Sequence, residues 1–144
     1  MGYATPDDMI ARYPNRDLVQ LTNEDPTATT VNIAPLQQAL DDAAAEIDGY
    51  LEGRFALPLT DPPAVLNRLA CDIAMYRLQS LRPLHDLADA RKRYEDAIAF
   101  LLEAAKGAVT LGLSPDSEEP PTAPEAMAIE GPQRVFDRNR LKGF

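Results

Sequence analysis

Residues 65–81, VLNRLACDIAMYRLQSL, are apolar around most of the circumference that they would present as a helix. Two apolar stripes run side by side along this segment at steps of three and four residues. One stripe holds Leu66, Leu69, Ile73 and Tyr76, and the other holds Cys71, Ala74, Met75 and Leu78. A helix with apolar side chains on two faces packs between other helices, because a single partner covers only one face. The segment therefore predicts a helical bundle with this helix at its centre.

A long helix is predicted on either side of this segment. The first covers residues 32–51 or 33–51, and the last covers residues 87–106, between a cap at Asp86 and a terminating Gly107. Their apolar stripes are formed by Leu36, Leu40, Ala43, Ile47 and Leu51 in the first helix, and by Leu87, Ala90, Tyr94, Ala97 or Ile98, Leu101 and Ala105 in the last. The other face of the first helix is acidic and is expected to meet solvent, through Asp41, Asp42, Glu46, Asp48 and Glu52.

Shorter elements complete the expected fold. Thr5 suits a helix cap and Pro6 the first helical position, so a short helix is predicted to about Arg12, followed by a turn over residues 16–21. The fold class is all-α: a small helical bundle of three long helices plus a short N-terminal helix. Alternating apolar residues admit a short strand over residues 109–113. The loop at residues 53–59 either turns two apolar side chains into the core or serves as an interface.

Charge divides the chain into three regions. Residues 1–113, the expected helical domain, hold 10 basic and 17 acidic side chains, a net charge of −7. Residues 114–130 hold five acids, four prolines and no base, a composition typical of an extended, solvated linker. Residues 131–144, GPQRVFDRNRLKGF, hold four bases and one acid among bulky apolar residues. We call this last region the C-terminal arm, and we predict that it docks on another surface.

The arm provides the candidate site residues of the chain: Arg134, Phe136, Arg138, Arg140, Leu141 and Phe144. Arginine and phenylalanine are common anchors of protein interfaces, and the linker gives the arm reach. We expect the arm to dock on a neighbouring subunit or a partner protein. Contact with nucleic-acid phosphates, and folding back on its own acidic domain, remain open from the sequence.

The sequence lacks the residues that several classes of function require. No apolar run approaches the ~20 residues of a bilayer span, and the N-terminus lacks the pattern of a signal peptide, so no membrane partner is expected. One cysteine, Cys71, and one histidine, His85, are too few for a structural zinc site. The paired carboxylates fall opposite the apolar stripes, where contact with water is expected to leave their pKa values near those of free carboxyl groups. We therefore predict no enzymatic activity, no metal and no cofactor.

Several stretches together resemble the Gp36-like family of Mu-like phages and prophages. They are residues 3–14 (YATPDDMIARYP), 40–51 (LDDAAAEIDGYL), 54–59 (RFALPL), 69–78 (LACDIAMYRL), 93–101 (RYEDAIAFL) and 134–144 (RVFDRNRLKGF). The resemblance follows the order of the chain and omits only the acidic linker. None of these strings is a catalytic motif.

The resemblance implies a structural role, because the family is similar to the helical head–tail connector (adaptor) proteins of tailed phages. Such a protein is made in the host cytoplasm and belongs to the virion neck, between head and tail. Its implied partners are the portal protein, further copies of itself in a ring that is usually dodecameric, and the next neck or tail-completion protein. DNA would pass through the ring without sequence-specific binding, and an acidic surface would repel its phosphates.

A second reading comes from a different function class. A net charge of −9 also fits a small acidic inhibitor, or DNA mimic, whose carboxylates occupy the nucleic-acid-binding site of a host protein. Salt-sensitive binding to a DNA-binding protein would distinguish it from a connector.

Overall fold

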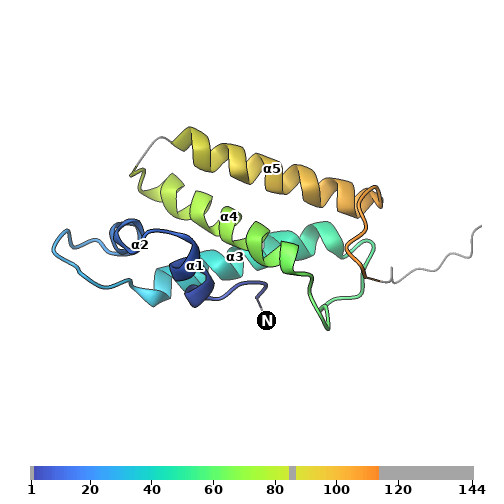
Figure 1. Ribbon diagram of the computed structural model, residues 1–144, viewed down its shortest axis with the longest axis horizontal. Helices are drawn as coiled ribbons and strands as arrows, with labels where there is room; N and C mark the ends of the chain where they lie inside the picture. Colours follow the sequence, from blue (N-terminus) through green and yellow to red (C-terminus); the bar gives the residue numbers. More distant parts are fainter. Residues whose placement is uncertain (1, 85–86, 114–144) are drawn as a thin grey trace, which may run out of the picture.

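Five helices make up the part of the chain that the computed structural model describes, residues 2–84 and 87–113. They are α1 (Pro6–Arg12), α2 (Asn15–Thr22), α3 (Ile33–Leu51), α4 (Ala64–Leu81) and α5 (Leu87–Lys106). Figure 1 shows α3, α4 and α5 running along the long axis of the molecule, with α1 and α2 beside α3 and α4. The expected all-α bundle is confirmed, and its three long helices lie where the sequence predicts them.

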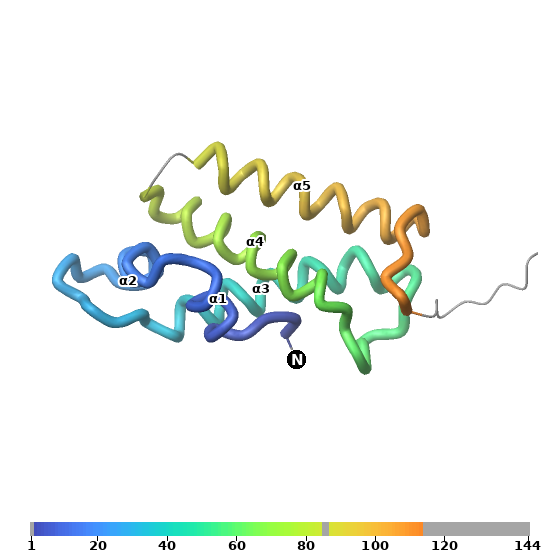
Figure 2. Tube along the Cα trace, viewed as in Figure 1, coloured from blue at the N-terminus to red at the C-terminus, as the bar shows by residue number. Residues whose placement is uncertain are grey.

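Helix α4 is the centre of the bundle, as its two apolar stripes predict. It packs extensively against both α3 and α5, and the tube in Figure 2 passes between them. Leu66, Leu69 and Ile73 are fully buried, and so is Cys71 from the second stripe. The stripe of α3 fits the same core, with Leu36, Leu40, Ala43, Ile47 and Leu51 at most 1% exposed.

Side chains cap α1 and α3; the cap predicted at Thr5 is confirmed, and the cap predicted at Asp86 lies outside the described residues. Thr5 and Asp8 form a capping box at the start of α1, in which each side chain accepts a hydrogen bond from the other residue's backbone N–H. Pro6 stands at the first helical position, where its missing N–H costs no hydrogen bond. At the start of α3 the Asn32 side chain accepts from the N–H of Ala34. These local bonds set the helix boundaries.

Helix α5 ends in a glycine turn, and this turn overturns the expected strand at residues 109–113. Gly107 has a φ of 80°, and the N–H of Ala108 donates to the carbonyl of Glu103 at 2.9 Å, as in a Schellman motif. Gly112 also has a positive φ, 73°. Within residues 2–84 and 87–113 no strand forms, because these turns bend the segment and no neighbouring strand can pair with it. The prediction was wrong; the alternation instead turns Leu111 into the core.

Two further segments add side chains to the core. The expected turn over residues 16–21 is a full helix, α2, which buries Leu18 and Leu21 against the long helices. In the loop at residues 53–59, Phe55 is 4% exposed and Leu57 packs against the core. The loop therefore anchors the bundle at one end instead of presenting these side chains to a partner.

Candidate functional site

The predicted docking residues Arg134, Phe136, Arg138, Arg140, Leu141 and Phe144 lie outside the described residues, and so do His85 and the acidic linker. The docking role of the C-terminal arm therefore stays a prediction. The described residues do show the hollows on the surface of the helical domain. They also show which partners the charged side chains of that domain already have.

The paired carboxylates of the sequence are used within the chain. Asp41 accepts from the Gln37 side chain at 2.8 Å and Asp42 from Gln38 at 3.1 Å, both one turn away on α3. On α5, Glu95 pairs with Arg91 and Glu103 with Lys106. Across residues 2–84 and 87–113, no three histidine, cysteine or acidic side chains lie together as a metal site would require.

Cys71 lies in the core of the bundle, on α4. Its side chain is fully buried, and burial raises the pKa of its thiol to about 11. A thiol with so high a pKa stays protonated near neutral pH, where only the thiolate is a strong nucleophile. The residue packs as a small apolar side chain.

Glu46 and Asp48 do not simply face solvent, and this corrects the expectation for the acidic face of α3. One carboxylate oxygen of Glu46 pairs with Arg77 of α4 at 2.5 Å, and the other accepts from the hydroxyl of Tyr94 on α5 at 2.7 Å. The hydroxyl of Tyr3 donates to Asp48 from the N-terminal segment. Both carboxylates therefore tie α3 to other parts of the chain.

Tyr94 makes the Glu46 contact a junction of three helices. Its ring stacks on Tyr76 of α4, with centroids 4.5 Å apart, and the hydrogen bond to Glu46 raises the pKa of its hydroxyl to about 12. The Nε atom of Arg77 is buried there with no hydrogen-bond partner in the described part of the chain. The junction thus rests on one carboxylate that holds two donors.

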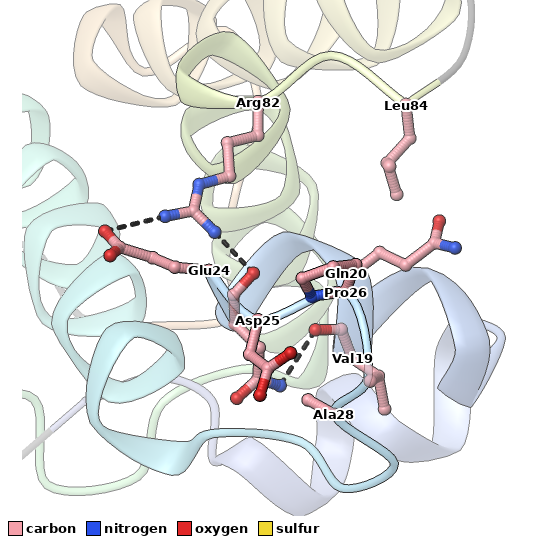
Figure 3. A pocket seen from close by; sticks show the side chains of 9 residues that line it. Val19, Gln20, Glu24, Asp25, Pro26, Ala28, Arg82 and Leu84 are labelled. Carbon is pink, nitrogen blue, oxygen red and sulfur yellow. Dashed lines mark hydrogen bonds and ion pairs between the residues drawn. The ribbon is translucent and has the colours of Figure 1, made fainter.

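Arg82, just beyond α4, holds the loop after α2 in place. Its guanidinium donates to the backbone carbonyl of Asn23 and pairs with Glu24 at 3.0 Å. Figure 3 shows these two bonds at the edge of a hollow of about 560 Å³, between the loop and the residues that follow α4. Arg77 and Arg82 thus each tie the end of α4 to another segment: Arg77 to α3, and Arg82 to the loop after α2.

A second hollow, which we call the α3–α4 groove, opens between the first half of α3 and the last turns of α4. Its volume is about 550 Å³. Apolar side chains line it: Leu21, Pro35, Ala39, Leu78 and Leu81. Leu81 is 81% exposed, more than any other large apolar side chain of the described residues. Three carboxylates, Glu24, Asp25 and Asp42, also line the groove, together with Arg77 and Arg82.

Two of these carboxylates, Asp25 and Asp42, accept hydrogen bonds from neutral donors of the chain. Asp25 accepts from the hydroxyl and the backbone N–H of Thr27, which lowers the pKa of its carboxyl and keeps it ionised. Among the described residues, neither Asp25 nor Asp42 forms an ion pair. The sequence could not reveal this groove, because its lining comes from segments about 60 residues apart.

The sequence matches known phage proteins over nearly the whole length of the chain. A family model described as Bacteriophage Mu, Gp36 matches residues 3–130. The chain belongs to this Gp36 family. The Mu-like prophage FluMu protein gp36 of Haemophilus influenzae is 43% identical over 142 residues, covering 99% of this chain and 97% of the relative. Gene product J of Escherichia phage Mu is 33% identical over 144 residues, covering 100% and 99%.

The Gp36-family match includes all five helices and both hollows. The match with gene product J of phage Mu extends further and includes the C-terminal arm. None of the described helices is both long and apolar enough to cross a bilayer. The predicted resemblance to Gp36-like phage proteins is therefore confirmed.

Proposed function

We propose that this Gp36-family chain is a structural subunit of the head–tail connector, the ring below the portal that extends the DNA channel and joins the capsid to the neck and tail. The observation that carries the proposal is membership of a phage family over nearly the whole chain. In this role the chain has no catalytic activity. Its partners are the portal protein, copies of itself in a ring of twelve, and the next neck or tail-completion protein.

The structure supports a scaffold role through the way its polar groups are used. Contacts such as the Glu46 junction and the Arg82 bonds to the α2 loop fix the helices relative to one another. A ring subunit must keep its shape while it repeats the same contact with each neighbour. The acidic surface of the domain also suits a DNA channel, since phosphate is repelled along its length.

The same bonds weigh against the acidic-inhibitor alternative. A DNA mimic needs carboxylates free to take the place of phosphates on a partner. Within residues 2–84 and 87–113, five carboxylates already pair with cations of the chain itself: Glu24, Glu46, Asp72, Glu95 and Glu103.

A genetic test separates the two functions. The gene is deleted in an inducible prophage that carries it, and the lysate is examined by electron microscopy. A connector predicts DNA-filled heads and separate tails that fail to join, with infectivity restored when the full chain is supplied. Deleting only residues 131–144 is expected to block joining as well. Normal tailed particles from the deleted prophage would contradict the connector role.

A further inference from the structure

The α3–α4 groove has the chemistry of a peptide-binding site with an apolar floor and an acidic rim. Leu81 stands 81% exposed beside the buried Leu78 and Ala39, so part of the floor is apolar surface in contact with water. Asp25 and Asp42 on the rim have no ion-pair partner in residues 2–84 and 87–113. The Arg77 charge is offset by Glu46, and the Arg82 charge by Glu24. Such a site favours a ligand with apolar anchors and positive charge.

One segment of this chain has that composition. The C-terminal arm holds four basic residues and one acid, and its cations alternate with Val135, Phe136, Leu141 and Phe144. Residues 1–113 and 114–130 are both acidic overall, with net charges of −7 and −5. The arm is therefore the one region of the sequence whose charge complements the rim.

The groove and the exit of the chain lie at opposite ends of the bundle. The groove is formed by the start of α3 and the end of α4, whereas α5 ends at the other end of the bundle (Figure 1), where Gly107 lies close to Arg54 of the loop at residues 53–59. Helix α4 has 18 residues, so about 27 Å of helix axis separates these ends. The linker is Pro-rich and acidic, a composition that stiffens a chain and repels it from an acidic domain. Docking of the arm in its own groove would lay this acidic linker along the acidic domain, whereas docking in the groove of a second copy would not.

We propose that the α3–α4 groove receives the C-terminal arm of a second copy of this chain. Apolar side chains of the arm cover Leu81 and its neighbours, while its arginines meet Asp25 and Asp42. The contact joins different surfaces of two copies, head to tail, which is the kind of contact that a closed ring repeats. The proposal rests on the proposed connector function for its biological setting, and it gives that function a subunit interface.

Cross-linking of the full chain tests the proposal in solution. One variant carries Gln38→Cys, at an exposed position on the rim of the groove, and the other carries Asn139→Cys, within the arm but outside its apolar anchors. Cys71 stays in both variants because it is fully buried. The two proteins are mixed under mild oxidation, and the heterodimer is measured on a non-reducing gel. A mixture of Leu102→Cys with Asn139→Cys is the control, since Leu102 is exposed on α5 outside the groove.

We expect the Gln38→Cys mixture to form heterodimer roughly tenfold faster than the control, or more, because docking raises the effective concentration of the arm at the groove. Adding Leu81→Lys to the groove variant should remove most of this advantage. Adding Ile10→Lys, a matched change at an exposed apolar residue of α1, should leave it unchanged. Equal rates in the two mixtures would overturn the proposal. So would a Gln38→Cys/Asn139→Cys double variant that closes an internal disulfide while the mixture forms no heterodimer, since the arm then binds its own domain.

This test is independent of the portal. Failure of the cross-link, with a layer still forming on portal rings, would overturn the arm-in-groove contact and leave the connector function in place. Cross-linking without such a layer would support the contact and contradict the connector function.

Discussion

Arg77 of α4 and Glu46 of α3 form an ion pair of 2.5 Å. Glu46 also accepts a hydrogen bond from the hydroxyl of Tyr94 on α5. The Glu46 side chain is 17% exposed and that of Arg77 is 42% exposed. The Nε atom of Arg77 is buried without a hydrogen-bond partner in the described part of the chain. The charge of Glu46 therefore stabilises a donor-rich junction of the three long helices, and its removal should be felt by the whole bundle.

Replacing Glu46 with Gln tests this junction. The variant keeps the size of the side chain but leaves the partly buried Arg77 without its counter-ion, so we expect the free energy of unfolding to fall by about 1–3 kcal/mol. Urea unfolding measures the change. The matched control is Glu95→Gln, because the Arg91–Glu95 pair is exposed on both sides; its loss should be at most about 0.5 kcal/mol. Equal losses in the two variants would contradict the role of the junction.

Because of the Tyr94 hydroxyl, we expect the free energy of unfolding to fall as the pH rises in the alkaline range. Its pKa is about 12 in the folded chain and 10.0 in a model compound, so the unfolded chain loses this proton first as the pH rises. The contribution of the Tyr94 hydrogen bond to the free energy of unfolding is complete below pH 10 and is lost between pH 10 and 12. We expect Tyr94→Phe to show a shallower fall in the free energy of unfolding across this range, measured by urea unfolding at each pH. Identical slopes for the variant and the parent chain would show that Tyr94 does not contribute.

Two glycines should respond in opposite ways to alanine. Gly107 has a φ of 80°, and a Cβ atom there would come within 2.4 Å of the Arg54 guanidinium, so we expect Gly107→Ala to destabilise the chain by about 1 kcal/mol or more. Gly49 lies inside α3, where a Cβ atom would meet nothing within 4 Å. Gly49→Ala should stabilise by about 0.5–1 kcal/mol. Thermal unfolding of the pair measures both signs, and a stabilising Gly107→Ala would contradict the turn at the end of α5.

The thiol of Cys71 should not react with thiol reagents while the chain is folded. Full burial and a pKa of about 11 keep it protonated and out of reach of an aromatic disulfide reagent. We expect the native protein to react at pH 8 only as fast as it unfolds, and to react at once in urea. Rapid stoichiometric labelling of the native protein would show instead that α4 is accessible to solvent.

The sequence predicted features that depend on neighbouring residues along the chain. Thr5 marked the start of α1 through its capping side chain, Gly107 marked the end of α5, and the double stripe of α4 placed it at the centre. The prediction of a strand at residues 109–113 was wrong because alternation of apolar residues alone does not supply a partner strand. The prediction also left out the turns that Gly107 and Gly112 impose.

Contacts between distant residues could not be predicted in the same way. Glu46 and Asp48 occupy the solvent side of a helical wheel for α3, yet their donors Arg77, Tyr94 and Tyr3 are 31 to 48 residues away. The α3–α4 groove likewise exists only once α2, α3 and α4 have packed together. The docking residues of the arm were chosen from composition, and they lie outside the part of the chain that the structure describes.

The connector function is tested most directly by electron microscopy of the purified chain mixed with its cognate portal rings. We expect an added layer on one end of the portal, with further copies arranged around the channel axis. Its absence from portal rings, and from filled and empty heads offered the same protein, would contradict the connector function and favour the acidic-inhibitor alternative.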